Sequence, residues 1–343
     1  MNITRTVLKE VVYPYAVGVY ACGGREKVVT ATELDGPCTA FWADTLEQEV
    51  LWEGHGGTMN TCQLNDRGDF LAIQQFYKGF NSREARIVRV EKTAAGWVQS
   101  TVAALPFVHR FAVADAGEAK FLICCILCRD KACKTDWSQP GCVKIARLPE
   151  DPAQAPVFTT LIDGIHRNHG LFTGTLDGKP CALVTGDEGV FRIDIPSAAD
   201  GAWQYEKIID RPVSDATVYD LDGDGRDEIV TIEPFHGGKV VVNTCTAEGW
   251  TPVYQYPVDF GHAIWSGEFL GGPAFLIGYR AANAALLLFR LREKYENEWM
   301  MDVTVLDEHE GPTNVAVVHE TERERVFACN GAKNRIVLYD VTR

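Results

Sequence analysis

The chain repeats one pattern of short strands about seven times. Each unit of roughly 40 to 55 residues holds a strand of small residues, a polar turn, an apolar strand, a second turn and an alternating strand. A fourth strand, often with Trp or Tyr, leads into the next unit. Short, evenly spaced strands with Gly and Asp turns are typical of all-β structure, and no stretch shows helical periodicity. The sequence therefore predicts an all-β, seven-bladed β-propeller.

The predicted propeller occupies residues 1–343 as a single domain. Its last unit ends at Arg343 after only three strands, so we expect residues 1–12 to supply the missing fourth strand and close the last blade. Such pairing leaves no long open sheet edge. The blades are expected at roughly these ranges: 13–53, 54–104, 105–160, 161–210, 211–258, 259–307 and 308–343.

Composition limits the classes of partner. The net charge of −14 argues against nucleic acid and anionic membranes, because binding phosphate requires a positive face. No segment approaches the roughly 18 uninterrupted apolar residues of a membrane helix, and the first residues lack the apolar core of a signal peptide. With 11 cysteines and no export signal, a reducing, cytoplasmic compartment is expected.

An acidic loop between two expected strands, DLDGDGRDE, predicts a cation site. Oxygen donors stand at its positions one, three, five and nine, and Gly225 at position six permits a tight turn, as in the first part of an EF-hand loop. We expect calcium or magnesium to act there as a structural clip. A regulatory cation site and an empty loop held by Arg226 and water are the alternatives. The expected ligands are Asp220, Asp222, Asp224 and Glu228.

A recurring position near the start of successive units carries polar side chains. An apolar strand begins about 12 to 14 residues after each of them, and residues in register across a repeat array lie at one level of a propeller channel. The residues at this position are His109, His169, Asp215, His262 and Asn314. The first four predict a site for zinc, manganese or iron. Channel histidines that are only hydrogen-bonded around buried water are the alternative.

The neighbours of these residues suggest catalytic groups. Arg110 and Arg167 each lie near an expected ligand, where a guanidinium suits a developing negative oxygen; an ion pair with Asp163 or Asp259 is the alternative. Candidates for proton transfer are Tyr15, His55 and His166. No functional role is expected for His236, His309 and His319, which fall outside the repeat position.

The loop DLDGDGRDE resembles the FG-GAP/VCBS-type propeller repeat. Together with FVHRF, HRNHG and FGHAIW, it makes the chain similar to the propeller portion of aldos-2-ulose dehydratase and its relatives. That resemblance implies a metal-dependent carbohydrate lyase that acts on a keto-sugar such as 1,5-anhydrofructose. Its implied reaction is proton abstraction, by His55 or His166, followed by β-elimination. A metal-assisted hydrolase such as a lactonase, and a non-catalytic ligand-binding or protein-binding propeller, stay open as alternatives.

Overall fold

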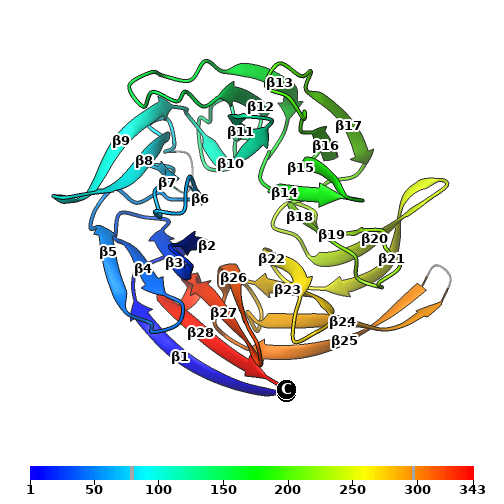
Figure 1. Ribbon diagram of the computed structural model, residues 1–343. Coiled ribbons are helices and arrows are strands. Elements are labelled where there is room, and N and C mark those ends of the chain that lie inside the picture. The colour runs from blue at the N-terminus through cyan, green and yellow to red at the C-terminus, as the bar shows by residue number, and fades with distance from the viewer. Residues whose placement is uncertain (78–80, 296–297) are drawn as a thin grey trace. The chain divides into compact units, whose positions relative to one another are not determined.

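The computed structural model describes residues 1–77, 81–295 and 298–343. These residues form seven four-stranded antiparallel sheets, and their fold is a seven-bladed β-propeller, as the repeat pattern predicted (Figure 1). The only helical element of the described residues is a three-residue 3-10 turn, Gly331–Lys333. No helix within these ranges is long and apolar enough to cross a membrane.

The chain divides into two compact units, a finer organisation than the single domain expected from the sequence. The N-terminal unit consists of residues 8–169 and 195–203, and the C-terminal unit of residues 1–7, 170–194 and 204–343.

The N-terminal unit contains three of the sheets. Their strands are β2 Pro14–Cys22, β3 Arg25–Thr32, β4 Cys38–Trp42 and β5 Gln48–Trp52; β6 Thr61–Gln63, β7 Phe70–Gln74, β8 Arg86–Thr93 and β9 Gly96–Ala104; and β10 Val108–Ala116, β11 Ala119–Cys128, β12 Pro140–Arg147 and β13 Thr159–Ile165. Strand β13 therefore extends past the rough blade boundary at residue 160. Every residue of β7 is buried, because this second strand of its sheet is covered on both faces.

The C-terminal unit contains the other four sheets. Their strands are β14 Leu171–Leu176, β15 Lys179–Gly186, β16 Gly189–Asp194 and β17 Gln204–Ile209; β18 Asp215–Tyr219, β19 Glu228–Glu233, β20 Lys239–Thr246 and β21 Gly249–Pro257; β22 Gly261–Glu268, β23 Pro273–Tyr279, β24 Leu286–Tyr295 and β25 Glu298–Asp307; and β26 Pro312–Glu320, β27 Arg323–Asn330, β28 Arg335–Thr342 and β1 Asn2–Glu10. Apolar side chains pack between neighbouring sheets, with Phe275 and Phe289 stacked at 4.6 Å.

The N-terminal strand completes the last sheet, as predicted. Strand β1 pairs with β28 in the order β1-β28-β27-β26 (Figure 1). The side chain of Arg5 anchors this strand through two hydrogen bonds. Its Nε donates to Asp307 Oδ2 at 2.8 Å, and its Nη2 donates to Glu310 Oε1 at 2.9 Å. Backbone pairing and an ion-pair network therefore act together at the closure.

Glu310 is the centre of that network. Its side chain is only 5% exposed, and its Oε2 accepts hydrogen bonds from Arg335 Nε at 2.9 Å and Asn330 Nδ2 at 3.0 Å. Burial alone would raise the pKa of Glu310, but the hydrogen bonds from Arg335 and Asn330 and the charges of Arg5 and Arg335 lower it below its ordinary value. The carboxylate is thus kept ionised between two guanidinium groups.

Deleting residues 1–12 should destabilise the last blade. The deletion removes the β1 ladder and the Arg5 contacts, which exposes the edge of β28. We expect a fall in the melting temperature of at least about 5 °C, measured by differential scanning calorimetry. An unchanged melting temperature would contradict closure by β1.

Glu310→Gln should destabilise the protein in a pH-dependent way. Because the folded-state pKa of Glu310 is lowered, its stabilisation is present above the unfolded-state pKa, about 4.3, and is lost as the pH falls through the folded-state pKa. We expect a loss of about 2–4 kcal/mol at pH 7 that shrinks below pH of about 4, measured by urea unfolding. If Glu310→Gln lowers the free energy of unfolding equally at pH 7 and below a pH of about 4, the charge of Glu310 is not the cause of the stabilisation.

Candidate functional site

A β-bulge recurs near the start of the first strand in four blades. The register of the strand pair skips one residue between Pro14 and Ala16, Val108 and Arg110, Gly261 and Ala263, and Pro312 and Asn314. The extra residues are Tyr15, His109, His262 and Thr313. Two of the predicted histidine ligands therefore occupy the same special backbone position, one in each unit.

The bulge shows that sequence spacing aligned Asp215 and Asn314 with the histidines one residue too late. In the fifth blade, Ser214 N–H donates to the Ile232 carbonyl at 2.8 Å while Asp215 pairs with the same Ile232, so Ser214 stands at the histidine position. Thr313, and not Asn314, stands there in the seventh blade. Because side chains alternate along a strand, a shift of one residue places Asp215 on the other face. Its Oδ1 accepts the Ala216 N–H at 2.9 Å.

In the N-terminal unit, His109 and His169 lie together. They are 4% and 2% exposed, and their ring centroids are 4.4 Å apart. Nδ1 of His109 lies 3.0 Å from the carbonyl oxygen of His169. A carbonyl only accepts, so Nδ1 carries the proton, and Nε2 is the nitrogen with the lone pair.

In the C-terminal unit, His262 repeats this arrangement. It is 2% exposed, and its Nδ1 lies 2.6 Å from the carbonyl oxygen of Thr313, the corresponding residue of the next blade. The same argument places the lone pair on Nε2. His262 thus links the sixth blade to the seventh, and His109 is bound to the His169 carbonyl within the N-terminal unit. In a neutral ring of this tautomer Nε2 can bind a metal, so these hydrogen bonds are compatible with a metal site and with the purely hydrogen-bonded alternative.

His236 lies beside His262, although the sequence analysis predicted no role for it. It lies in the turn between β19 and β20, with its ring 5.4 Å from that of His262, and ligand nitrogens of the two lie within 4.8 Å. Phe235 and Phe260 stack on His236 at 3.9 and 4.5 Å. In antiparallel strands, the turn after the second strand returns to the end where the first strand begins. That topology was the signal available to find His236.

Two of the catalytic candidates are part of the packed interior. Tyr15 is 2% and Arg110 is 7% exposed, and the Arg110 guanidinium lies 5.6 Å from the Tyr15 ring centroid. Arg110 Nη1 donates to the Met59 carbonyl. The alternative partner Asp163 instead pairs with Arg129 at 2.6 Å. The geometry gives Arg110 a structural contact that the sequence did not anticipate.

The other three catalytic candidates lie in loops before first strands. His55 is exposed between β5 and β6, while His166 and Arg167 are half-buried between β13 and β14. The Arg167 guanidinium lies 5.3 Å from the Trp137 ring centroid. Asn168 is fully buried and holds this loop through a hydrogen bond to the Cys142 carbonyl at 2.8 Å.

The acidic loop is preorganised by its own backbone. Asp220 Oδ1 accepts N–H groups from Gly223 at 2.7 Å and Asp224 at 3.2 Å, and Oδ2 accepts from Gly225 at 2.9 Å. Gly225 has φ +86°, which explains glycine at this turn. Carboxylate oxygens of Asp220, Asp222 and Asp224 lie within 4.8 Å of one another.

Two basic side chains neutralise part of this loop. Arg226 Nη2 lies 2.9 Å from Asp224 Oδ2, as the alternative foresaw, and Lys294 of β24 pairs with Asp222 and lies 3.7 Å from Asp224. Lys294 comes from the next blade, so the local sequence gave no sign of it.

Glu228 turns back into the loop. Its Oε2 accepts the Leu221 N–H at 2.9 Å. Burial raises the pKa of Glu228 to about 8, and the charges of the neighbouring aspartates add to the effect. The carboxylates that lie close enough to share a cation are therefore those of Asp220, Asp222 and Asp224. Glu228 is hydrogen-bonded to the Leu221 backbone.

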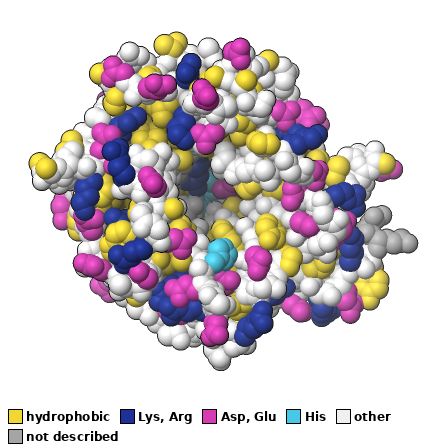
Figure 2. All heavy atoms as spheres, viewed as in Figure 1, with side chains coloured by type: hydrophobic (Ala, Val, Ile, Leu, Met, Phe, Trp, Pro, Cys, Tyr) yellow, Lys and Arg dark blue, Asp and Glu magenta, His cyan; other side chains and the backbone are white. Residues whose placement is uncertain are grey.

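On the face shown in Figure 2, acidic and basic side chains are interspersed, and no large basic area gathers there. This distribution accords with the net charge of −14.

Comparison with known proteins supports the fold. No family model matches the chain, and no curated protein sequence matches it. Among solved structures, the mitotic checkpoint complex is similar with a TM-score of 0.63 and 10% identity, over 99% of this chain and 94% of that one. The Cps50 (Swd1) β-propeller domain of Myceliophteria thermophila gives 0.62 and 11%, over 99% and 100%.

A putative 6-phosphogluconolactonase from Bacteroides uniformis is similar with a TM-score of 0.57 and 12% identity, over 96% of this chain and 95% of that one. At such low identities, these likenesses establish that the chain is a β-propeller and go no further.

A hard cation should compete with Lys294 for the acidic loop. We expect millimolar calcium to raise the melting temperature by several degrees, because a ligand at about 100 times its Kd stabilises by about 2.7 kcal/mol. Asp222→Ala with Asp224→Ala should abolish the shift, and Lys294→Gln should enlarge it, measured by scanning fluorimetry with and without EDTA. Asp115→Ala, at an exposed position near the end of β10 in the third blade, is the control. If calcium leaves the melting temperature of the wild type unchanged, the loop is held without a cation, by Arg226, Lys294 and its own backbone hydrogen bonds.

Proposed function

We propose that this propeller is a metal-dependent enzyme in which His236 and His262 bind a divalent transition metal. One observation carries the proposal: ligand nitrogens of these two imidazoles lie within 4.8 Å of each other, and His262 is buried. Zinc, manganese and iron all accept imidazole ligands, and a catalytic site keeps a position for water or substrate.

The surroundings of the two histidines suit a metal. The hydrogen bond from His262 Nδ1 to the Thr313 carbonyl fixes the tautomer that leaves Nε2 for coordination, as second-shell carbonyls do in metal sites. Phe235 and Phe260 stack on the half-buried His236 and hold its ring beside that of His262. His109, His169 and Asp215, the other ligands expected from the sequence, stay predictions.

The proposed reaction is elimination of water from a keto-sugar. The resemblance carried by DLDGDGRDE, FVHRF, HRNHG and FGHAIW to the dehydratase propellers supports this choice. A bound divalent metal would polarise the substrate carbonyl and acidify the neighbouring C–H. Proton transfer by Tyr15, His55 or His166, and charge stabilisation by Arg110 or Arg167, are predictions from the sequence.

Two other functions are favoured by particular comparisons. The likeness to the Bacteroides uniformis protein favours a lactonase, in which the same metal would activate water. The likeness to the mitotic checkpoint complex favours a non-catalytic propeller that binds a protein partner. The second of these requires no metal, so metal content separates it from both enzymes.

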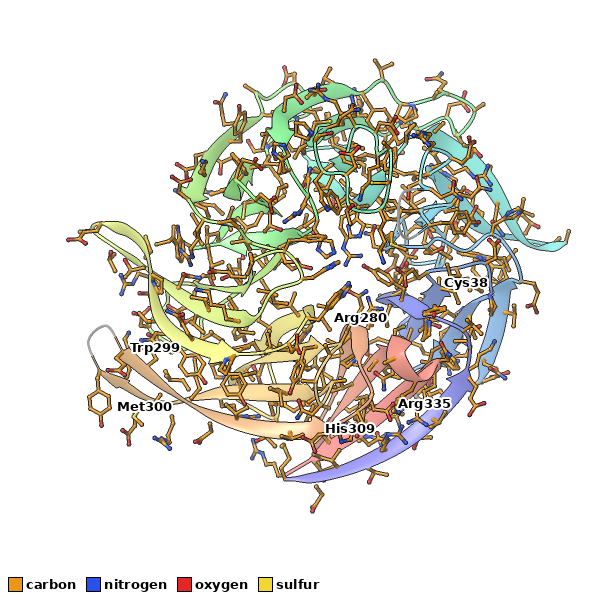
Figure 3. All side chains as sticks on the ribbon, turned by 180° about the vertical axis from the view of Figure 1, so that it is seen from behind. Cys38, Arg280, Trp299, Met300, His309 and Arg335 are labelled. Atoms are coloured by element: carbon orange, nitrogen blue, oxygen red, sulfur yellow. The ribbon has the colours of Figure 1, made fainter. Side chains whose placement is uncertain are left out.

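His236→Ala and His262→Ala should each remove stoichiometric metal without unfolding the protein. Metal content is measured by elemental analysis of untagged protein, and the fold by circular dichroism. The control is His309→Asn, in the loop after β25 (Figure 3), because Asn tolerates the left-handed backbone of His309 at φ 63°. Metal retained in both variants would contradict the proposed ligands.

The reaction is tested on the same preparations. Formation of an enone absorption band from 1,5-anhydrofructose, lost in both histidine variants by at least about 100-fold, is the expected result. Release of acid from a sugar lactone with no enone would favour the lactonase instead. A wild type that carries no metal and turns over neither compound would favour the binding propeller.

A further inference from the structure

Arg280 is a half-buried cation beside the two histidines. It follows β23 directly, at the start of the connection to β24 in the sixth blade, and is labelled in Figure 3. Its guanidinium carbon lies 5.4 Å from the centroid of the Phe260 ring, a cation–π contact. Its backbone N–H donates to the Phe260 carbonyl at 3.0 Å, and Ala281 N–H donates to the Asp259 carbonyl at 3.1 Å. These contacts fix the segment that carries the side chain.

Phe260 connects Arg280 to the candidate metal ligands. Its ring is 4.5 Å from that of His236, and it is parallel within 2° to that of His262 at 6.5 Å. A cation–π contact uses none of the N–H donors of a guanidinium for a hydrogen bond, so they can bind a planar or tetrahedral anion. The stack therefore presents a cation at the same end of the blade as the imidazoles.

Arg280 differs from comparable arginines of this acidic protein. Arg211 is held by Glu233 at 2.9 Å, Arg325 by Asp340 at 3.1 Å and Arg335 by Glu310. Over the ranges that the structure describes, no carboxylate forms an ion pair with Arg280. A half-buried guanidinium that no protein carboxylate neutralises can pair with an anionic ligand through charge-assisted hydrogen bonds.

We propose that Arg280 binds the phosphate or carboxylate group of an anionic sugar derivative whose reacting carbons lie at His236 and His262. The proposal rests on the proposed function, and it assigns the substrate a class: a phosphorylated sugar or a sugar acid. This role is separate from the one predicted for Arg110 or Arg167, which is to hold the negative oxygen that develops during the reaction.

Calorimetric binding to the full chain tests this assignment. The probes are glucose 6-phosphate, gluconate and glucose at constant ionic strength, which separate phosphate, carboxylate and neutral ligands. We expect one anionic probe to bind at least about 10-fold more tightly than glucose, as a charge-assisted pair requires. Arg280→Gln should reduce that affinity to the level of glucose, and Arg280→Lys should retain part of it. The matched control is Arg292→Gln on β24 of the same blade, which should bind as the wild type does.

Equal binding of the three probes by the wild type would overturn the inference, as would an anion preference that survives in Arg280→Gln. Metal content of the same samples separates this result from the proposed function. If metal-free protein prefers an anionic probe over glucose and Arg280→Gln removes that preference, the anion-binding role is supported and the metal site is contradicted. If the protein contains metal but binds all three probes equally, only the role of Arg280 is contradicted.

Discussion

A hydrogen bond from a histidine Nδ1 to a backbone carbonyl is the interaction on which the candidate site depends. It occurs within each unit, from His109 to His169 and from His262 to Thr313. Each joins buried groups that would cost about 1–3 kcal/mol if left unsatisfied, and the second joins the sixth blade to the seventh. It also decides which nitrogen keeps a lone pair. The same hydrogen bond therefore stabilises the fold and fixes the tautomer in which Nε2 can coordinate a metal.

A second constraint is that the last sheet has to be completed by the beginning of the chain. β1 supplies the backbone ladder, and Glu310 holds Arg5 and Arg335 together beneath it. The geometry of β26, and with it the Thr313 carbonyl that orients His262, is therefore supported by residues more than 300 positions apart in sequence. The last blade therefore closes the sheet and, through the Thr313 carbonyl, also orients His262.

The sequence predicted what depends on periodicity. The strand repeat predicted the propeller, and the missing fourth strand predicted the closure by residues 1–12, because both follow from the hydrophobic pattern. It did not predict the bulge, since a single extra residue leaves the pattern on either side unchanged; Asp215 was therefore aligned one residue out of register. His236 and Lys294 were missed because they act across turns and blades, whereas sequence spacing reports only position along the chain.

Crystals of the full chain test the proposed metal between His236 and His262, with diffraction collected on both sides of the absorption edges of zinc, manganese and iron. If the metal is zinc, we expect an anomalous peak about 2.0–2.1 Å from a nitrogen of each imidazole, with His262 bound through Nε2. Metal-loaded crystals with no anomalous peak at these two histidines would contradict it.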